Sequence, residues 1–267
     1  MNPALIDLAA LPHTAPLPML FIGHGSPMNT LEDNSWTARW QQLAQALPRP
    51  AAILCISAHW ETPSPQASAA HWPQTIHDFR GFPPALQQYQ YPAPGAPALA
   101  QWLHQHADVT MDAGQGLDHG AWSVLARMYP HADIPVAQLS LARPFDAAAH
   151  LALGARLAPL RQRGVLLLAS GNVVHNLRDR STHTPAWAED FEARAKQALL
   201  TRDDDALVAL LTEDAAALAA NPTAEHYQPL LYLLGARSVE DQVSCPTEGL
   251  DQGTLSMLSV LFQPSHS

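Results

Sequence analysis

Histidine is the residue type whose positions in this sequence point most directly to chemistry. The chain has 14 histidines, as many as its lysines and arginines together. Three of them, His24, His59 and His175, follow apolar runs typical of buried strands, and two, His119 and His226, stand where helices are expected to begin. Neutral imidazoles bind zinc and ferrous iron, and an incomplete protein shell leaves positions for substrate or oxygen. The pattern predicts a catalytic metal site.

Signatures of several other enzyme classes are missing from the sequence. It contains no G-x-S-x-G elbow, no phosphate-binding loop, no G-x-G-x-x-G after a strand and no H-E-x-x-H helix. A Ser-His-Asp hydrolase could be assembled from Ser26 or Ser170 with His175, but the other four histidines would then have no role. A zinc hydrolase of a small amide or ester, and a metal-binding protein without activity, remain as alternatives.

The elements that must position the histidines are readable from hydrophobic patterning. The three apolar runs before His24, His59 and His175 predict strands over Met19–Ile22, Ala52–Ser57 and Val165–Ser170. In open α/β sheets, ligands bind at the carboxyl ends of the strands. Histidines that follow three such strands are therefore expected to share one site.

Helical and extended patterns alternate along the rest of the chain. Further strands are expected over Val109–Asp112, Ile134–Leu141 and, at an edge of the sheet, Thr254–Phe262. Helices are expected over Asn34–Leu47, Ala96–His106, Asp146–Leu160, Ala186–Thr201, Asp203–Ala220 and Thr223–Gly235, and a further one begins after the cap residue Asp118. The alternation predicts an α/β fold with a central, largely parallel or mixed sheet flanked by helices, and right-handed β-α-β crossovers. We expect one catalytic domain over residues 1–267, with an irregular N-terminal arm over Met1–Pro18.

A long segment rich in proline and aromatic residues, His71–Gly95, fits no regular element and is too apolar for a disordered tail. Long ordered loops are usually functional. We therefore expect this segment to form one wall of a pocket, although a connector packed on the surface is the simpler alternative.

Composition narrows the classes of partner. A net charge of −10 with 14 lysines and arginines argues against binding to nucleic acid or to an anionic membrane surface. The N-terminal residues lack the charge pattern of a signal peptide, and no run approaches the roughly 20 apolar residues of a membrane span. Cys55 and Cys245 form no metal-binding pair in sequence. We expect a soluble cytoplasmic protein, either a monomer or a small homo-oligomer.

Seven segments in order resemble the class III extradiol ring-cleaving dioxygenases, in particular the branch of the DOPA 4,5-dioxygenases. They are FIGHGSP, CISAHW, HDFRGFP with QYQYPAPG, LDHGAWSVL, IPVAQLSL, ASGNVVHNL and AEHYQPLLYLLGA, and they extend from about Met19 to Gly235. The resemblance implies the fold of the superfamily that includes the protocatechuate 4,5-dioxygenase β subunit. It also implies one divalent metal ion, Fe(II) for activity, with Zn(II) as an occupant of the isolated protein.

The resemblance further implies roles for individual residues. His24 and His59 match the first two metal ligands and His226 the third. In the protocatechuate branch the third ligand is a glutamate, for which Glu225 is available, but AEHYQPL resembles the branch with three histidines. His175 matches the active-site base and can also approach the metal as a fourth ligand.

The implied reaction opens the ring of a catechol with O₂. His175 would help to deprotonate the bound catechol, and His119, neutral at a helix start, would hydrogen-bond the oxygen. Four residues of the aromatic loop are expected to line the ring pocket: Asp78, Phe79, Tyr89 and Tyr91.

Overall fold

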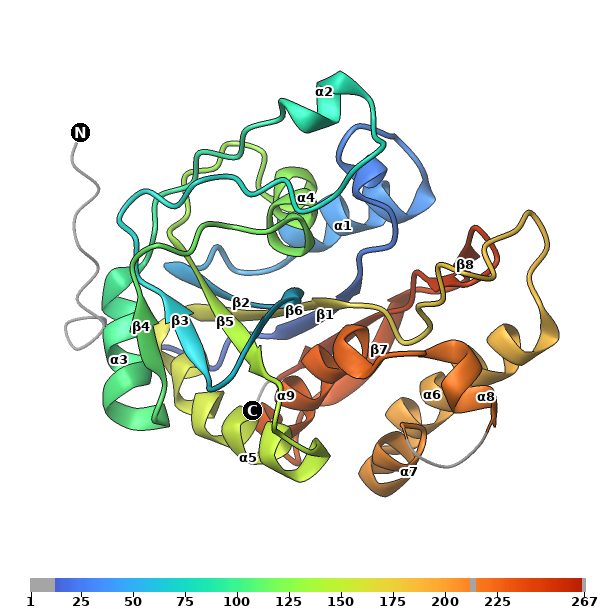
Figure 1. Cartoon of the computed structure of the whole chain (residues 1–267). Coiled ribbons are helices and arrows are strands. Elements are labelled where there is room, and N and C mark those ends of the chain that lie inside the picture. Colours follow the sequence, from blue (N-terminus) through green and yellow to red (C-terminus); the bar gives the residue numbers. More distant parts are fainter. Residues whose placement is uncertain (1–12, 212–214, 266–267) are drawn as a thin grey trace.

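A mixed β-sheet is the centre of the protein (Figure 1). The computed structural model describes residues 13–211 and 215–265. Within these residues, eight strands form this sheet in the order β4-β3-β5-β2-β6-β1-β10-β7. In chain order they are β1 (Met19–Gly23), β2 (Ala52–Thr62), β3 (Gln66–Ser68), β4 (Thr110–Asp112), β5 (Val136–Ala142), β6 (Val165–Gly171), β7 (Gln242–Thr247) and β10 (Ser259–Gln263). A separate hairpin pairs β8 (Leu250–Asp251) with β9 (Leu255–Ser256).

The four central strands, β5, β2, β6 and β1, are parallel. Every residue of β1, β5 and β6 is buried, as expected for parallel strands covered on both faces. In the register of the sheet, Ser170 of β6 lies opposite both Ile22 of β1 and Ser57 of β2. The carboxyl ends of these three strands are therefore level, and the residues that follow them meet at one edge.

Helices cover both faces of this sheet (Figure 1). The helices are α1 (Ser35–Ala46), α2 (Pro84–Gln87), α3 (Pro97–Ala107), α4 (His119–Met128), α5 (Ala147–Leu157), α6 (Ala186–Thr201), α7 (Asp204–Ala209), α8 (Ala215–Ala220) and α9 (Gln228–Ala236), with 3₁₀ turns η1 (Pro27–Thr30), η2 (Ala158–Arg163) and η3 (Ala224–His226). Leu20 and Ile22 of β1 pack with α1 and α4, whereas Met19 and Phe21 pack on the opposite face with α3, α5 and α9. The described chain is a single α/β domain.

Local sequence signals explain the helices nearest the site. Asn34 caps α1 in a capping box with Thr37, whose backbone N–H donates to Asn34 Oδ1. Asp118 caps α4 by accepting the backbone N–H of Ala121, so His119 is the first residue of that helix. Both starts agree with the sequence patterns.

Several elements differ from the expectations. Strand β2 does not end at Ser57 but continues to Thr62, so His59 lies within it. The segment Asp203–Ala220 forms two helices, α7 and α8, with residues 210–214 between them, of which 212–214 lie outside the described residues. The Thr223–Gly235 pattern divides into η3 and α9.

The C-terminal strand is internal rather than at an edge. Strand β10 pairs antiparallel with β1 on one side and with β7 on the other, so β7 forms the edge. The sequence of β7, QVSCPT, contains a proline and little alternation, which is why its pattern was too weak to predict a strand.

The expected N-terminal arm is described only from residue 13. Residues 13–18 form no helix or strand, and Leu17 donates its N–H to the carbonyl of Arg161. Arg161 is buried, pairs with Asp241 and also donates to the carbonyl of Leu17. Among the described residues, no helix is both long and apolar enough to cross a membrane.

Candidate metal centre

Three histidines from three different elements have their rings close together. His24 directly follows β1, and His226 is the last residue of η3. His59 lies where the pairing of β2 with β5 shifts register between Ile56 and Glu61. Such an irregularity re-aims a side chain that a regular strand would direct elsewhere.

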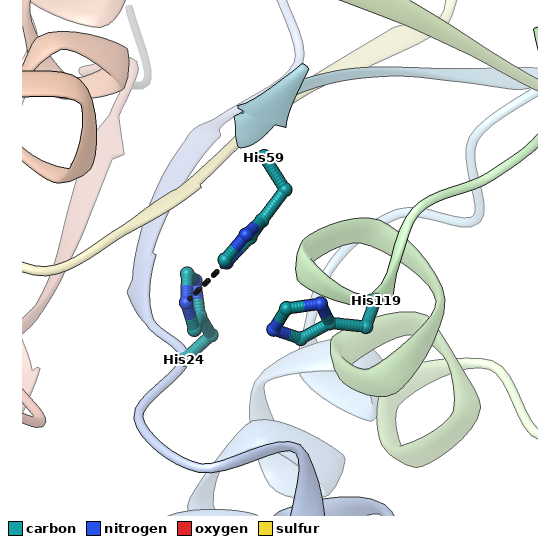
Figure 2. Close-up of side chains that lie close together, drawn as sticks. All are labelled: His24, His59 and His119. Carbon is teal, nitrogen blue, oxygen red and sulfur yellow. Dashed lines mark hydrogen bonds between the residues drawn. The ribbon is translucent and has the colours of Figure 1, made fainter. Parts of the chain in front are cut away.

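The rings of these histidines form a nearly equilateral triangle. The ring centres of His24 and His59 are 5.1 Å apart, those of His24 and His226 5.4 Å, and those of His59 and His226 4.9 Å. Figure 2 shows the close approach of His24 and His59, whose Nε2 atoms are 3.2 Å apart. Two nitrogens bound to one ion at about 2.1 Å each, at an angle of about 90 to 110°, would be separated by about 3.0 to 3.4 Å. The spacing fits two ligands of one metal.

The tautomer of His24 follows from its hydrogen bonds. Its Nδ1 is 3.0 Å from Ser170 Oγ, and Ser170 donates its only hydroxyl proton to the carbonyl of Gly120. Ser170 must therefore accept a hydrogen bond from His24 Nδ1–H, which leaves the lone pair of the ring on Nε2. Because its hydroxyl is engaged with both His24 and Gly120, Ser170 is not free to act as a nucleophile.

His226 is oriented by its sequence neighbour. Its Nδ1 lies 3.0 Å from Glu225 Oε1, and its Nε2 is buried without a hydrogen-bond partner among the described residues. Its carbonyl accepts the N–H of Asn172, and a Cβ on Gly171 would lie only 2.1 Å from that carbonyl. A glycine at the end of β6 is thus needed for η3 to approach the sheet. A buried nitrogen without a hydrogen-bond partner, close to the rings of two other histidines, is an arrangement that a metal ion would satisfy.

Asp78 joins two other histidines. Its carboxylate lies 3.5 Å from His59 Nδ1 and 2.9 Å from His119 Nδ1, and it accepts the backbone N–H of His119. Burial alone would raise the pKa of this carboxyl, but its contacts with His119 and His59 outweigh burial and lower it. The ionised carboxylate can only accept, so it favours a proton on Nδ1 of both rings.

The three histidines are uncharged at neutral pH in the absence of metal. Burial is the largest cause that lowers the pKa of His24, His59 and His226 well below the usual value, and the neighbouring histidines lower it further. Metal binding requires neutral imidazole, so these environments favour the ligand state.

His175 lies against His226 in a face-to-face stack. Their ring centres are 3.4 Å apart and the planes differ by 6°. Lone pairs of imidazoles lie in the ring planes, so two stacked parallel rings cannot direct them at the same point. Burial lowers the pKa of His175 to about 4, which keeps it neutral and able to accept a proton.

His119 provides an alternative third nitrogen. It lies close enough to His24 and His59 for the three to hold an ion, and Figure 2 shows it approaching from the start of α4. Its ring centre is 3.8 Å from that of His59 but 6.0 Å from that of His24. The more even triangle with His226, together with the orphaned Nε2 there, favours His226.

A cavity of about 660 Å³ opens over the histidines. Phe79 lines it and lies edge-on to His119, with ring centres 5.4 Å apart. Asp78 also lines it, although its carboxylate is engaged with histidines. Tyr89 and Tyr91 do not line it: Tyr89 stacks on Trp122, and Tyr91 is buried in the core with its hydroxyl donated to the carbonyl of Tyr129.

The cavity includes residues that the sequence did not indicate. Phe82 packs edge-on against Phe79, and Leu177, Arg180 and Gln252 also line the cavity. The aromatic loop itself was a signal for Phe82. Nothing in the sequence relates Gln252 to the site, because the β8–β9 hairpin that carries it is brought there only by the fold.

Comparison with known proteins identifies the family of the chain. The profile of the family described as the catalytic LigB subunit of aromatic ring-opening dioxygenase matches residues 7–263. A protein of Escherichia coli (strain K12) named 4,5-DOPA dioxygenase extradiol is 47% identical over 271 residues, which cover 97% of this chain and 99% of that protein. A protein of the same name from Beta vulgaris is 36% identical over 255 residues, 91% of this chain and 95% of that protein.

A solved structure shares the fold. The crystal structure of an uncharacterized protein from Escherichia coli K12 matches with a TM-score of 0.80 and 43% identity, over 92% of this chain and 99% of that one. With a family match over almost the whole chain and relatives of this similarity, the chain belongs to the LigB family of catalytic subunits of aromatic ring-opening dioxygenases.

Proposed function

We propose that the protein binds one Fe(II) ion through Nε2 of His24, His59 and His226 and opens the ring of a catechol with O₂. As a member of its family it is a metal-dependent extradiol dioxygenase. The observation that supports the ligand assignment is the placement of the three rings: their centres lie 4.9 to 5.4 Å apart, and each Nδ1 lies within 3.5 Å of Ser170, Asp78 or Glu225, so that Nε2 is the nitrogen left for an ion. The same nitrogen shell would also accept Zn(II).

Bound Fe(II) would supply Lewis acidity toward the two catechol oxygens and a path for electrons from the ring to O₂. Three neutral ligands leave the full double positive charge at the site, which strengthens the attraction for a catecholate. Asp78 and Glu225 hold the ligand rings in position and raise their basicity.

His175 acts as the base in this proposal. Its low pKa means that it is neutral near pH 7, and it lines the cavity beside His226. A neutral imidazole at that place can accept a proton from a catechol hydroxyl. The stacking on His226 favours this role over that of a fourth ligand.

His119 lies beside the proposed ligands and lines the cavity. Its Nδ1 lies 2.9 Å from a carboxylate oxygen of Asp78, which restrains the position of the ring. In this proposal His119 hydrogen-bonds the oxygen.

The substrate in this proposal is a catechol that carries a side chain, such as DOPA, because the relatives at 47% and 36% identity are named for it. We place the enzyme in the cytoplasm, as a monomer or small homo-oligomer, with one catalytic domain over residues 1–267.

The test is oxygen incorporation. Enzyme loaded with Fe(II) without air, then supplied with DOPA and ¹⁸O₂, should consume one O₂ per catechol and yield a ring-opened product that is heavier by both labelled atoms. The Zn(II) form should not turn over. Turnover under nitrogen, or ester hydrolysis by the Zn(II) form at a comparable rate, would favour the zinc hydrolase, and no turnover with catechols would favour a metal-binding protein without activity.

A further inference from the structure

The cavity has a rim that the proposed chemistry does not use. Arg180 and Gln252 both line the cavity. Arg180 belongs to the segment after β6, and Gln252 to the turn between β8 and β9. Two segments 72 residues apart in sequence therefore present polar groups to the same cavity.

Gln252 is held in this place by its backbone. Its φ of 47° is in the left-handed region, which a residue other than glycine adopts only when the surroundings require it. Its carbonyl accepts the N–H of Ser181, which ties the hairpin to the segment that carries Arg180. The two segments thus brace each other at the mouth of the cavity.

Arg180 is held by two hydrogen bonds, and these leave some of its N–H groups without a partner among the described residues. Its Nε donates to the carbonyl of Leu177 at 3.2 Å, and its Nη1 donates to Gln252 Oε1 at 3.4 Å. A guanidinium has five N–H groups, so most remain for a ligand. Its positive charge is also close enough to His175 to add to the effect of burial, the main cause of the lowered pKa of His175.

The other charges of the cavity leave this cation without a carboxylate partner. Asp78 and Glu225, the acidic residues of the lining, contact the Nδ1 atoms of histidines. Arg80, a second cation of the lining, has no hydrogen bond or ion pair within the described residues, whereas Arg180 makes the two hydrogen bonds given above.

We propose that Arg180, braced by Gln252, binds a carboxylate on the side chain of the catechol and makes the enzyme select catechols that carry such a group. This inference rests on the proposed function, because it requires the ring to be at the histidines. The planar fork of arginine matches a carboxylate with two parallel hydrogen bonds, which a lysine or glutamine cannot reproduce.

The experiment compares two substrates of the Fe(II) enzyme. Dihydrocaffeate carries a carboxylate on a short side chain, and 4-methylcatechol is neutral. The ratio of their kcat/KM values should fall about 10- to 100-fold in Arg180→Gln, as expected for a lost charged hydrogen-bonding pair. Arg180→Lys should lose part of the preference, because it keeps the charge but not the fork.

Two control variants distinguish a direct contact of Arg180 with the carboxylate from a general effect of positive charge near the cavity. Arg178→Gln removes a nearby exposed cation that does not line the cavity, and its ratio should stay within about twofold of the unmodified enzyme. Arg80→Gln removes a cation of the cavity itself. An equal loss of preference in Arg80→Gln, or an unchanged ratio in Arg180→Gln, would overturn the proposal.

Binding without oxygen keeps this test independent of ring cleavage. Calorimetric titration of the Fe(II) enzyme under nitrogen gives the Kd of each catechol, and Arg180→Gln should weaken dihydrocaffeate selectively. Equal weakening of both ligands would show that Arg180 only stabilises its loop. If no catechol is turned over in air, the proposed reaction fails, while the two Kd values still decide the role of Arg180.

Discussion

At the scale of single residues, Glu225 contacts one of the two ring nitrogens of its neighbour His226 and leaves the other nitrogen free within the described part of the chain. Glu225 contacts Nδ1 of His226, whereas Nε2 of His226 is the buried atom without a partner. A carboxylate in this position orients a ligand and increases its basicity without binding the ion itself. The pair explains why a glutamate beside the third histidine need not be a ligand.

We therefore predict different metal contents for variants at these two positions. His226→Ala should lose most of its iron, because it removes one of three ligands, while Glu225→Gln should keep stoichiometric iron at saturation with an affinity lower by about 10- to 100-fold. Metal analysis after gel filtration measures this, with circular dichroism as a check of folding. Full iron in His226→Ala together with its loss in Glu225→Gln would make Glu225 the ligand.

His175 gives a second prediction at this scale. His175→Gln should retain iron and bind catechol without air but lose ring cleavage by about a hundredfold or more, since a positioned base typically contributes that much. Metal content, anaerobic titration and oxygen uptake separate these steps. Loss of iron would place His175 among the ligands, and normal turnover would leave it a purely structural role.

At the scale of elements, α4 approaches β2 through a glycine. A Cβ on Gly120 would lie 2.4 Å from Ser57 Oγ and 2.8 Å from His59 Cδ2. The carbonyl of Gly120 also accepts the hydroxyl of Ser170, which orients His24. The first turn of α4 therefore helps to position both His24 and His59, two of the proposed metal ligands.

Gly120→Ala should consequently reduce metal affinity while the fold persists. The added methyl group must displace Ser57 or His59, and overpacking of this kind costs about 1 to 3 kcal/mol of stability. Gly114→Ala is a matched control. Gly114 lies in an exposed turn, and the nearest atom to its added Cβ would be the side-chain oxygen Oδ1 of Asp112, at 3.3 Å. Competition with a chelator measures the affinities, and equal values for the two variants would contradict the supporting role of α4.

Sequence patterns predicted these elements best where the signal is local. The bounds of α6 match the expected Ala186–Thr201, and the caps Asn34 and Asp118 begin their helices as expected. The continuation of β2 through His59 was not predictable, because it depends on renewed pairing of Glu61 with Leu141. The exclusion of Tyr91 from the cavity likewise depends on a hydrogen bond to Tyr129, a residue 38 positions away.

At the scale of the whole molecule, the site exists only after long-range assembly. Its histidines come from strand ends, a strand irregularity, a helix start and a 3₁₀ turn spread over more than 200 residues. The sequence singled out these histidines through their places in local patterns and through the resemblance to a family, and their roles stay predictions. It could not indicate the Nδ1 partner of His24, since Ser170 lies 146 residues away.

The opposite face of the sheet contains a histidine that links two helices and is remote from the cavity. His150 of α5 is fully buried, and its Nδ1 lies 3.1 Å from the hydroxyl of Tyr232 on α9. These helices are in close contact, because a Cβ on Gly154 would lie 2.2 Å from the carbonyl of Tyr232. Burial lowers the pKa of His150 to about 4, although nearby Asp146 raises it slightly.

This low pKa predicts that acid destabilises the whole molecule in part through His150. Above the unfolded pKa of about 6.5, neither state binds the proton; between 6.5 and about 4, only the unfolded state does, so stability falls as the pH falls. The loss due to His150 is about 2 kcal/mol at pH 5. His150→Gln, which cannot bind a proton, should therefore lose about 2 kcal/mol less between pH 7.5 and pH 5 than the unmodified protein.

Urea unfolding of the two metal-free proteins at both pH values measures this difference. The buried histidines of the metal centre also take up protons on unfolding, but they are the same in both proteins and cancel in the comparison. The variant is expected to be less stable than the unmodified protein at pH 7.5, because it disturbs the contact with Tyr232. This loss is present at both pH values, so it cancels when the change in stability between pH 7.5 and pH 5 is compared. Equal losses in the two proteins would mean that His150 gains its proton in the folded state as readily as in the unfolded chain, and that the packing of α5 on α9 opens to water before the molecule unfolds.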